Sequence, residues 1–194
     1  MEVRALEILI MRRNRKDYIL AFLLSLSNNE VKGRYELSKE LGIGEGVLRG
    51  IYQELREGGL ITVGKGGTRL TPKGLEELEK MLSVNGIIHA VFLNDFEVWG
   101  RKYIGVAAAL RRNVKNVVEA RDAAVRSGAH IALIAKREAD RIFLPMVEEY
   151  DLLQNAPQLY SVLASLPPAE SYAVVLGDNL LPCVKGLIEL AKQE

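Results

Sequence analysis

The stretch LGIGEGVLRGIYQELREGGLITVGKGGTRLTPKG, residues 41–74, decides the fold of the first part of the chain. Its apolar residues follow the 3.6-residue period of a helix over 45–57, and Gly58-Gly59 ends that helix. A shorter helix is expected over 35–41, and the glycine-rich residues 42–44 form the tight turn between the two helices. The pattern predicts a helix-turn-helix.

The residues after this pair of helices predict a β-hairpin. Residues 60–63 form a short strand, 64–67 a glycine-rich turn and 68–71 the returning strand. A helix then follows over 72–82, with Pro72 in its first turn, Thr71 as its N-cap, and Leu75, Leu78, Met81 and Leu82 on its core face. The hairpin makes this the winged variant of the helix-turn-helix.

Two more helices are expected ahead of the quoted stretch. Residues 17–26 have apolar side chains at helical spacing, and Asp17 suits the N-cap or the first turn. Residues 3–10 form a second amphipathic segment, which is a candidate for packing across a dimer. Arg12, Arg13, Arg15 and Lys16 between them are the densest basic cluster of the chain.

Three short strings resemble those of winged-helix transcription regulators. They are Leu-Gly-Ile at 41–43, Glu-Leu-Arg-Glu-Gly-Gly-Leu-Ile at 54–61 and Leu-Thr-Pro-Lys-Gly at 70–74. In such regulators the third helix enters the major groove of DNA and the hairpin reaches the backbone or the minor groove. The resemblance therefore implies binding of duplex DNA by residues 17–82.

Carried over to this chain, the resemblance implies five DNA-binding residues. Arg49 would pair with guanine and Gln53 with adenine. Arg34, Lys65 and Arg69 would contact phosphates, which set the register of the protein on DNA and carry no sequence information. The third helix departs from the family pattern because it exposes Glu45, Gly46 and Gly50. These glycines permit close approach to DNA, or else the helix contacts protein or RNA instead.

The second half is expected to be an α+β domain. A junction at 83–86 divides the chain into 1–85, the winged helix-turn-helix, and 86–194. The expected order is a strand over 87–93, a turn at 94–96, a strand over 98–107, a helix over 113–127 capped by Asn113, and strands over 129–135 and 141–145. A helical stretch over 152–166, a strand over 172–176 and a helix over 181–192 complete it. This order predicts a two-layer, ββαββα-like domain with a mainly antiparallel sheet and its helices on one face.

The whole chain also resembles an uncharacterised family of archaeal two-domain proteins that join a winged helix to an α+β domain. The residues that carry this resemblance in the second half are EARDAAVRSGA at 119–129 and Phe-Leu-Pro at 143–145. The element order of this half is also similar to that of the small inserted domain of some bacterial aspartyl-tRNA synthetases and amidotransferases. Neither resemblance implies an activity.

Charge and cysteine content narrow the classes of function. The net charge is +1, but residues 1–73 hold 13 Lys and Arg against 9 Asp and Glu, a weak positive excess of the kind that phosphate binding requires. Cys183 is the only cysteine, which excludes an internal disulfide and a cysteine-based zinc site. No apolar stretch approaches the ~20 residues of a membrane-spanning helix, so a soluble, cytoplasmic protein is expected.

The second half contains few residues that suggest chemistry. Gly177-Asp178-Asn179, ahead of the last helix, is a candidate anion or ligand site, although ordinary helix capping explains the same residues. His89, His130 and Cys183 are expected to be structural. Trp99, Tyr103 and Phe143 are expected in the core, with a ligand pocket or a dimer seam as the alternative.

The prediction for function is a DNA-binding transcriptional regulator, in which the second half mediates dimerisation or senses a small-molecule effector. The alternative is an adaptor or RNA-associated accessory protein that uses the winged helix for protein or RNA contacts. An enzyme within residues 86–194 ranks last, because no P-loop, nucleophile elbow, zinc motif or dinucleotide fingerprint occurs. No cofactor or metal is expected.

Overall fold

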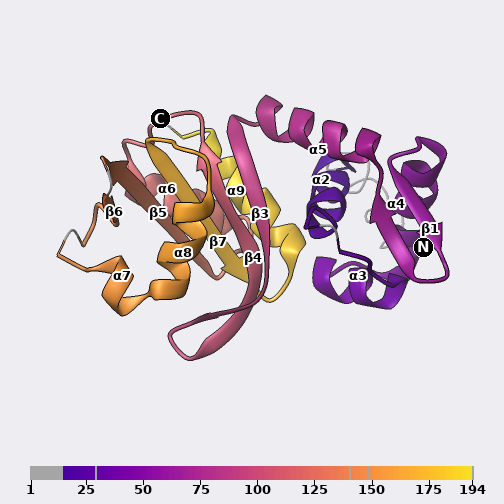
Figure 1. Ribbon diagram of the computed structural model, residues 1–194, viewed down its shortest axis with the longest axis horizontal. Helices are drawn as coiled ribbons and strands as arrows, with labels where there is room; N and C mark the ends of the chain where they lie inside the picture. The colour runs from indigo at the N-terminus through magenta and orange to yellow at the C-terminus, as the bar shows by residue number, and fades with distance from the viewer. Residues whose placement is uncertain (1–14, 29, 140, 148, 194) are drawn as a thin grey trace.

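The computed structural model describes residues 15–193 except 29, 140 and 148. Its helices and strands form two parts that lie side by side along the long axis (Figure 1). The first part consists of α2 (Arg15–Ser25), α3 (Arg34–Leu41), α4 (Glu45–Glu57), β1 (Ile61–Gly64), β2 (Gly67–Leu70) and α5 (Pro72–Val84). The second consists of β3 (Ile87–Val98), β4 (Arg101–Leu110), α6 (Val117–Arg126), β5 (Ile131–Glu138), β6 (Arg141–Phe143), α7 (Leu152–Asn155), α8 (Pro157–Ser165), β7 (Ser171–Gly177) and α9 (Leu180–Ala191).

The first part follows the local signals of the sequence closely. α4 spans the expected residues, and Gly42 ends α3 in the left-handed conformation with φ 68°. β1 and β2 pair antiparallel, with Ile61 opposite Leu70 and Gly64 opposite Gly67. Thr71 caps α5 by accepting a hydrogen bond from the Gly74 amide. Leu75 was expected on the core face of α5 but is 43% exposed.

α2 lies between the two parts, and its C-terminal half is buried on every side. Its residues 20–25 are all buried, as expected of a helix that is apolar on every side. It packs on α5 and α3 of the first part and on α9 and β3 of the second. One hydrophobic cluster therefore runs from α3 and α4 through α2 to the sheet. The expected N-terminal helix over 3–10 and the cations Arg12 and Arg13 lie outside the described residues.

The second part is built on an antiparallel sheet of five strands in the order β3-β4-β7-β5-β6. The expected antiparallel sheet is thus confirmed, but the two-layer arrangement with helices on one face is wrong. α6 and α9 cover one face and α8 covers the other (Figure 1). The side chains of β7 show why both faces are covered. Ala173 and Val175 belong to the hydrophobic cluster that includes α2, while Tyr172, Val174 and Leu176 belong to a second cluster on the opposite face of the sheet. A strand buried on both faces has no polar side to leave open to water.

The hairpin of β3 and β4 differs from the expected one. Residues 94–96 are not the turn but a β-bulge within β3, where Asp95 has φ 48°. The chain turns at Trp99 and Gly100, both with positive φ, between the paired Val98 and Arg101. The ring of Trp99 is 69% exposed, so its expected place in the core is also wrong.

Two further expectations in the second part are corrected. Asn116, not Asn113, caps α6, where its side chain accepts from the Glu119 amide. Asn113 instead accepts hydrogen bonds from Lys136 and Ser171. The helical stretch over 152–166 is two helices, α7 and α8, divided at Ala156. Within the described residues, no helix is both long and apolar enough to cross a membrane.

Candidate nucleic-acid interface

Arg34 joins three elements of the first part. It begins α3, and its guanidinium lies over the ring of Tyr52 on α4, 4.9 Å from the ring centroid. The Tyr52 hydroxyl in turn shares a hydrogen bond with the hydroxyl of Thr68 on β2. α3, α4 and the hairpin are therefore connected by one cationic and two hydroxyl-bearing side chains.

Arg49 lies beside Arg34. Both line a pocket of ≈ 240 Å³ together with Tyr35 and Glu45. Tyr35, which is 80% exposed and follows Arg34 at the start of α3, was not among the predicted site residues. The sequence feature that could have indicated Tyr35 as a site residue is an aromatic side chain next to an arginine at the start of a helix. Glu45 places a negative charge at the same pocket, which weakens its attraction for phosphate.

Gln53 lies one turn beyond Arg49 on the exposed face of α4. Its side-chain Nε2 donates to Glu57 Oε1 at 2.9 Å. Because both groups are exposed, the bond with Glu57 competes with water and leaves the Gln53 amide available for a ligand. Glu54 beside it forms an ion pair with Arg15 of α2.

Lys65 and Arg69 lie on the hairpin. Lys65 is exposed in the turn between β1 and β2, and Arg69 is exposed on β2 opposite Thr62. Successive side chains of a strand point to opposite faces, so Arg69 points away from the face on which Thr68 meets Tyr52. The structure thus brings Arg34 and Arg49 together, places Gln53 on the same helix as Arg49, and turns Arg69 to the other face of the hairpin.

Gly46 and Gly50 have no packing role in the described chain. A Cβ atom built on either residue would meet nothing within 4 Å. The helical Gly186 differs, because its Cβ would lie 3.0 Å from the carbonyl oxygen of Ala124. The two glycines of α4 therefore lower helix stability without relieving a clash.

A buried ion pair lies behind this surface. Lys32, which is 1% exposed, places its Nζ 2.7 Å from Glu40 on α3 and 2.7 Å from Glu30. Burial raises the pKa of Glu40, and the hydrogen bond and charge of Lys32 oppose that rise. This pair was not predicted, because nothing in the string Glu-Val-Lys-Gly at 30–33 indicates that its lysine is buried.

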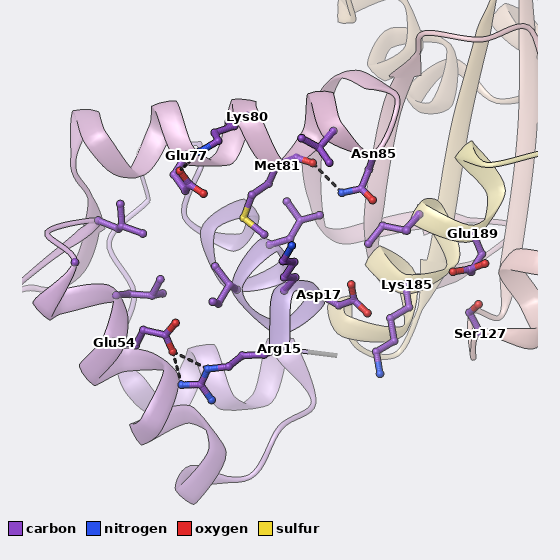
Figure 2. Close-up of a pocket in the computed structure, with 18 of the residues that line it drawn as sticks. Arg15, Asp17, Glu54, Glu77, Lys80, Met81, Asn85, Ser127, Lys185 and Glu189 are labelled. Atoms are coloured by element: carbon purple, nitrogen blue, oxygen red, sulfur yellow. Dashed lines mark hydrogen bonds and ion pairs between the residues drawn. The ribbon is translucent and has the colours of Figure 1, made fainter. Parts of the chain in front are cut away.

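A groove of ≈ 1290 Å³ separates the two parts on another side of α2 (Figure 2). Its lining comes from α2, α4, α5 and α9, with the apolar Ile19, Leu60 and Met81 between charged side chains. Figure 2 shows Arg15 directed at Glu54, while Asp17 and Lys185 lie at the end of the groove nearest α9. The charges there are of both signs, so the groove has no clear preference for a cation or an anion.

Asp17 is expected to make stability pH-dependent. Burial raises its pKa, while Lys185 and Lys192 act in the opposite direction. A raised folded-state pKa means that Asp17 supports the fold below its unfolded-state pKa and that this support is lost as pH rises through the folded-state value. Asp17→Asn should therefore gain stability relative to the wild type between about pH 4 and pH 7, as measured by urea unfolding. If the stabilities of Asp17→Asn and the wild type changed with pH in parallel, this expectation would be wrong.

The candidate anion site at residues 177–179 is occupied by the protein's own side chains. Asp178 Oδ1 lies 3.0 Å from Arg101 Nη2 and 3.6 Å from His130 Nδ1. Asn179 is the N-cap of α9 but forms no capping hydrogen bond, and its side chain packs against Gly42 at the end of α3. An added anion would have to displace the Asp178 carboxylate from Arg101.

The remaining candidates show no reactive arrangement. Cys183 is buried, and burial, reinforced by the charge of Asp178, raises its pKa to about 12. Such a thiol carries almost no thiolate at neutral pH. His89 is exposed on β3, and Phe143 is buried below Arg141. Among the described residues, no three His, Cys, Asp or Glu side chains group closely enough to hold a metal ion.

Comparisons with known proteins show the fold. No protein-family model matches the sequence, and no curated protein matches it either. A solved structure of a hypothetical protein from Pyrococcus horikoshii OT3 has a TM-score of 0.67 and 24% sequence identity to this chain. The similarity covers 91% of this chain and 90% of that chain. The two chains therefore share an arrangement of elements over most of their lengths.

Proposed function

We propose that residues 17–82 form a winged helix-turn-helix that binds duplex DNA, and that the protein is a transcriptional regulator. The observation that carries the proposal is the joined surface of α3, α4 and the hairpin. Arg34 and Arg49 meet there at one pocket, and the Tyr52–Thr68 hydrogen bond fixes the hairpin beside α4. In a winged helix this surface faces the DNA, with α4 in the major groove.

In this proposal the five residues have different tasks. Arg34 and Lys65 contact phosphates on the two sides of α4, and Arg69 contacts a phosphate that reaches the outer face of the hairpin. Arg49 and Gln53, one helical turn apart, contact base edges. Of the five side chains, only that of Gln53 would exchange a hydrogen bond with another side chain, Glu57, for one with DNA.

The second part supplies dimerisation or effector sensing in this proposal. A two-fold dimer would present two α4 helices to successive turns of DNA. The groove between the parts is lined by Glu54 and Leu55 of α4 and by Ile188 of α9. A small molecule bound there would contact both the DNA-binding helix and the helix that covers the sheet.

The salt dependence of DNA binding tests the proposal. Each phosphate contact adds about 0.9 to the slope of log K against log salt concentration. Lys65→Ala and Arg69→Ala should each flatten the slope by about that amount in filter binding. Lys115→Ala and Arg126→Ala, which remove exposed cations of the second part, are the matched controls and should leave it unchanged. Absence of measurable affinity at ~50 mM salt would rule out the proposal.

A second function is favoured by the charge of α4. Its exposed residues include Glu45, which lines the same pocket as Arg49, and Glu57 at its C-terminal end. Two acids on a groove-facing helix oppose a polyanion. A protein or structured RNA partner would tolerate such a mixed surface. Competition between transfer RNA and duplex DNA for the purified protein distinguishes the two functions, because a regulator retains the duplex.

A further inference from the structure

Lys32 is joined to the hairpin through its backbone. Its amide donates to the Thr68 carbonyl at 3.1 Å, and the Thr68 amide donates to the Lys32 carbonyl at 2.9 Å. Lys32 therefore forms an isolated antiparallel bridge to β2, at Thr68. Thr68, which is fully buried, is the same residue whose hydroxyl meets Tyr52 of α4.

The side chain of Lys32 connects this edge to the sheet. Its ammonium lies between Glu40 and Glu30 and 4.2 Å from the centroid of the Phe92 ring on β3. Asn28 reinforces the connection by donating to the Phe92 carbonyl at 3.4 Å. One residue thus contacts the hairpin, α3 and the second part of the chain.

A hairpin of two four-residue strands needs such an attachment. Two isolated strands of this length are marginally stable in water. The base of this hairpin is closed by the Thr71 amide, which donates to the Leu60 carbonyl at 3.0 Å just before α5 begins. Nearer the turn, Thr68 is held by Lys32 through its backbone and by Tyr52 through its hydroxyl.

We propose that Lys32 is a positioning residue that holds the hairpin beside α4 and fixes both to β3, so that Lys65 and Arg69 reach phosphate. This inference rests on the proposed function. It also gives the sheet a route to the DNA-binding surface, because any displacement of Phe92 acts on the side chain of Lys32, whose backbone is paired with Thr68. Phe92 is 4% exposed and belongs to the cluster that joins the two parts.

The test uses the double variant Lys32→Met with Glu40→Gln in the full chain. Removing both charges together keeps the buried shape and leaves no buried charge unpaired, because Glu30, the other partner of Lys32, is 37% exposed and stays hydrated. The fold is therefore retained. The slope of log K against log salt concentration should flatten by about 1.8, the value of two phosphate contacts. Adding Lys65→Ala and Arg69→Ala to this variant should then flatten the slope no further. Hydrogen exchange at the Thr68 amide should become faster.

Two other results would overturn the inference. In one, the double variant keeps the wild-type slope; in the other, its effect adds fully to that of Lys65→Ala and Arg69→Ala, as independent sites do. If the wild type itself shows no salt-dependent binding to DNA, the result contradicts the proposed function and not only the role of Lys32. Phe92→Leu is the second variant: it removes the ring beside the ammonium and leaves a smaller apolar side chain in the core. It should speed exchange at Thr68, and unchanged exchange would contradict the connection to the sheet.

Discussion

Replacing both Gly46 and Gly50 with alanine is expected to stabilise the chain by about 1–2 kcal/mol and to weaken its binding to duplex DNA about tenfold or more. An interior helical glycine such as Gly50 costs roughly 1 kcal/mol relative to alanine, and Gly46, in the first turn of α4, costs no more than that. Open space surrounds both positions, so the added methyl groups meet nothing in the free protein. In a complex the same methyl groups would enter a packed interface, where added volume costs about 1–3 kcal/mol.

The two measurements are informative together because stability is expected to rise while affinity for DNA is expected to fall. Urea unfolding gives the change in stability, and filter binding at fixed salt gives the change in affinity. Ser161→Ala, an exposed position on α8, is the control, because it raises helix propensity away from α4 and should leave binding unchanged. A stabilised variant with wild-type affinity would mean that DNA does not approach this face of α4.

The first part of the fold was readable from sequence because its boundaries are set locally. Gly42 in the left-handed conformation and Thr71 ahead of Pro72 end or begin helices by their own chemistry. The bounds of α4 and the pairing of β1 with β2 followed from the same kind of signal. The exposure of Arg49 and Gln53 followed from the helical period of the buried residues between them.

The second part depends on contacts that periodicity does not record. β7 alternates between two buried clusters, so its apolar run predicted a strand without showing that α8 covers its second face. The bulge at Asp95 was mistaken for a turn, because a polar residue with positive φ suits both. The true turn at Trp99-Gly100 lacks the usual asparagine or aspartate.

The most important residue behind the candidate site was also the least visible in sequence. Lys32 and Phe92 are 60 positions apart, and burial of a lysine runs against the usual preference for the surface. The sequence identified the cations that face solvent, Arg34, Lys65 and Arg69. It did not identify the cation that holds the elements together.

Lys32→Met alone is expected to destabilise the fold by about 3–5 kcal/mol at pH 8 and much less at pH 4. Removing one partner of a buried pair leaves the other charge uncompensated. Glu40 is 5% exposed, and burial already raises its pKa against the effect of Lys32. Without the ammonium, the pKa of Glu40 in the folded state rises further.

The sign of the pH dependence follows from that shift. At low pH, Glu40 is protonated in both the folded and the unfolded variant, and no buried charge remains. As pH rises past the ordinary carboxyl value of about 4.3, the unfolded chain releases its proton first, so the folded state of Lys32→Met loses stability until its own Glu40 has ionised. Adding Glu40→Gln should restore most of the stability and remove this dependence, as followed by urea unfolding from pH 4 to pH 8. A loss of stability in Lys32→Met that does not change with pH would contradict this account, because an uncompensated Glu40 carboxylate could not then be its cause.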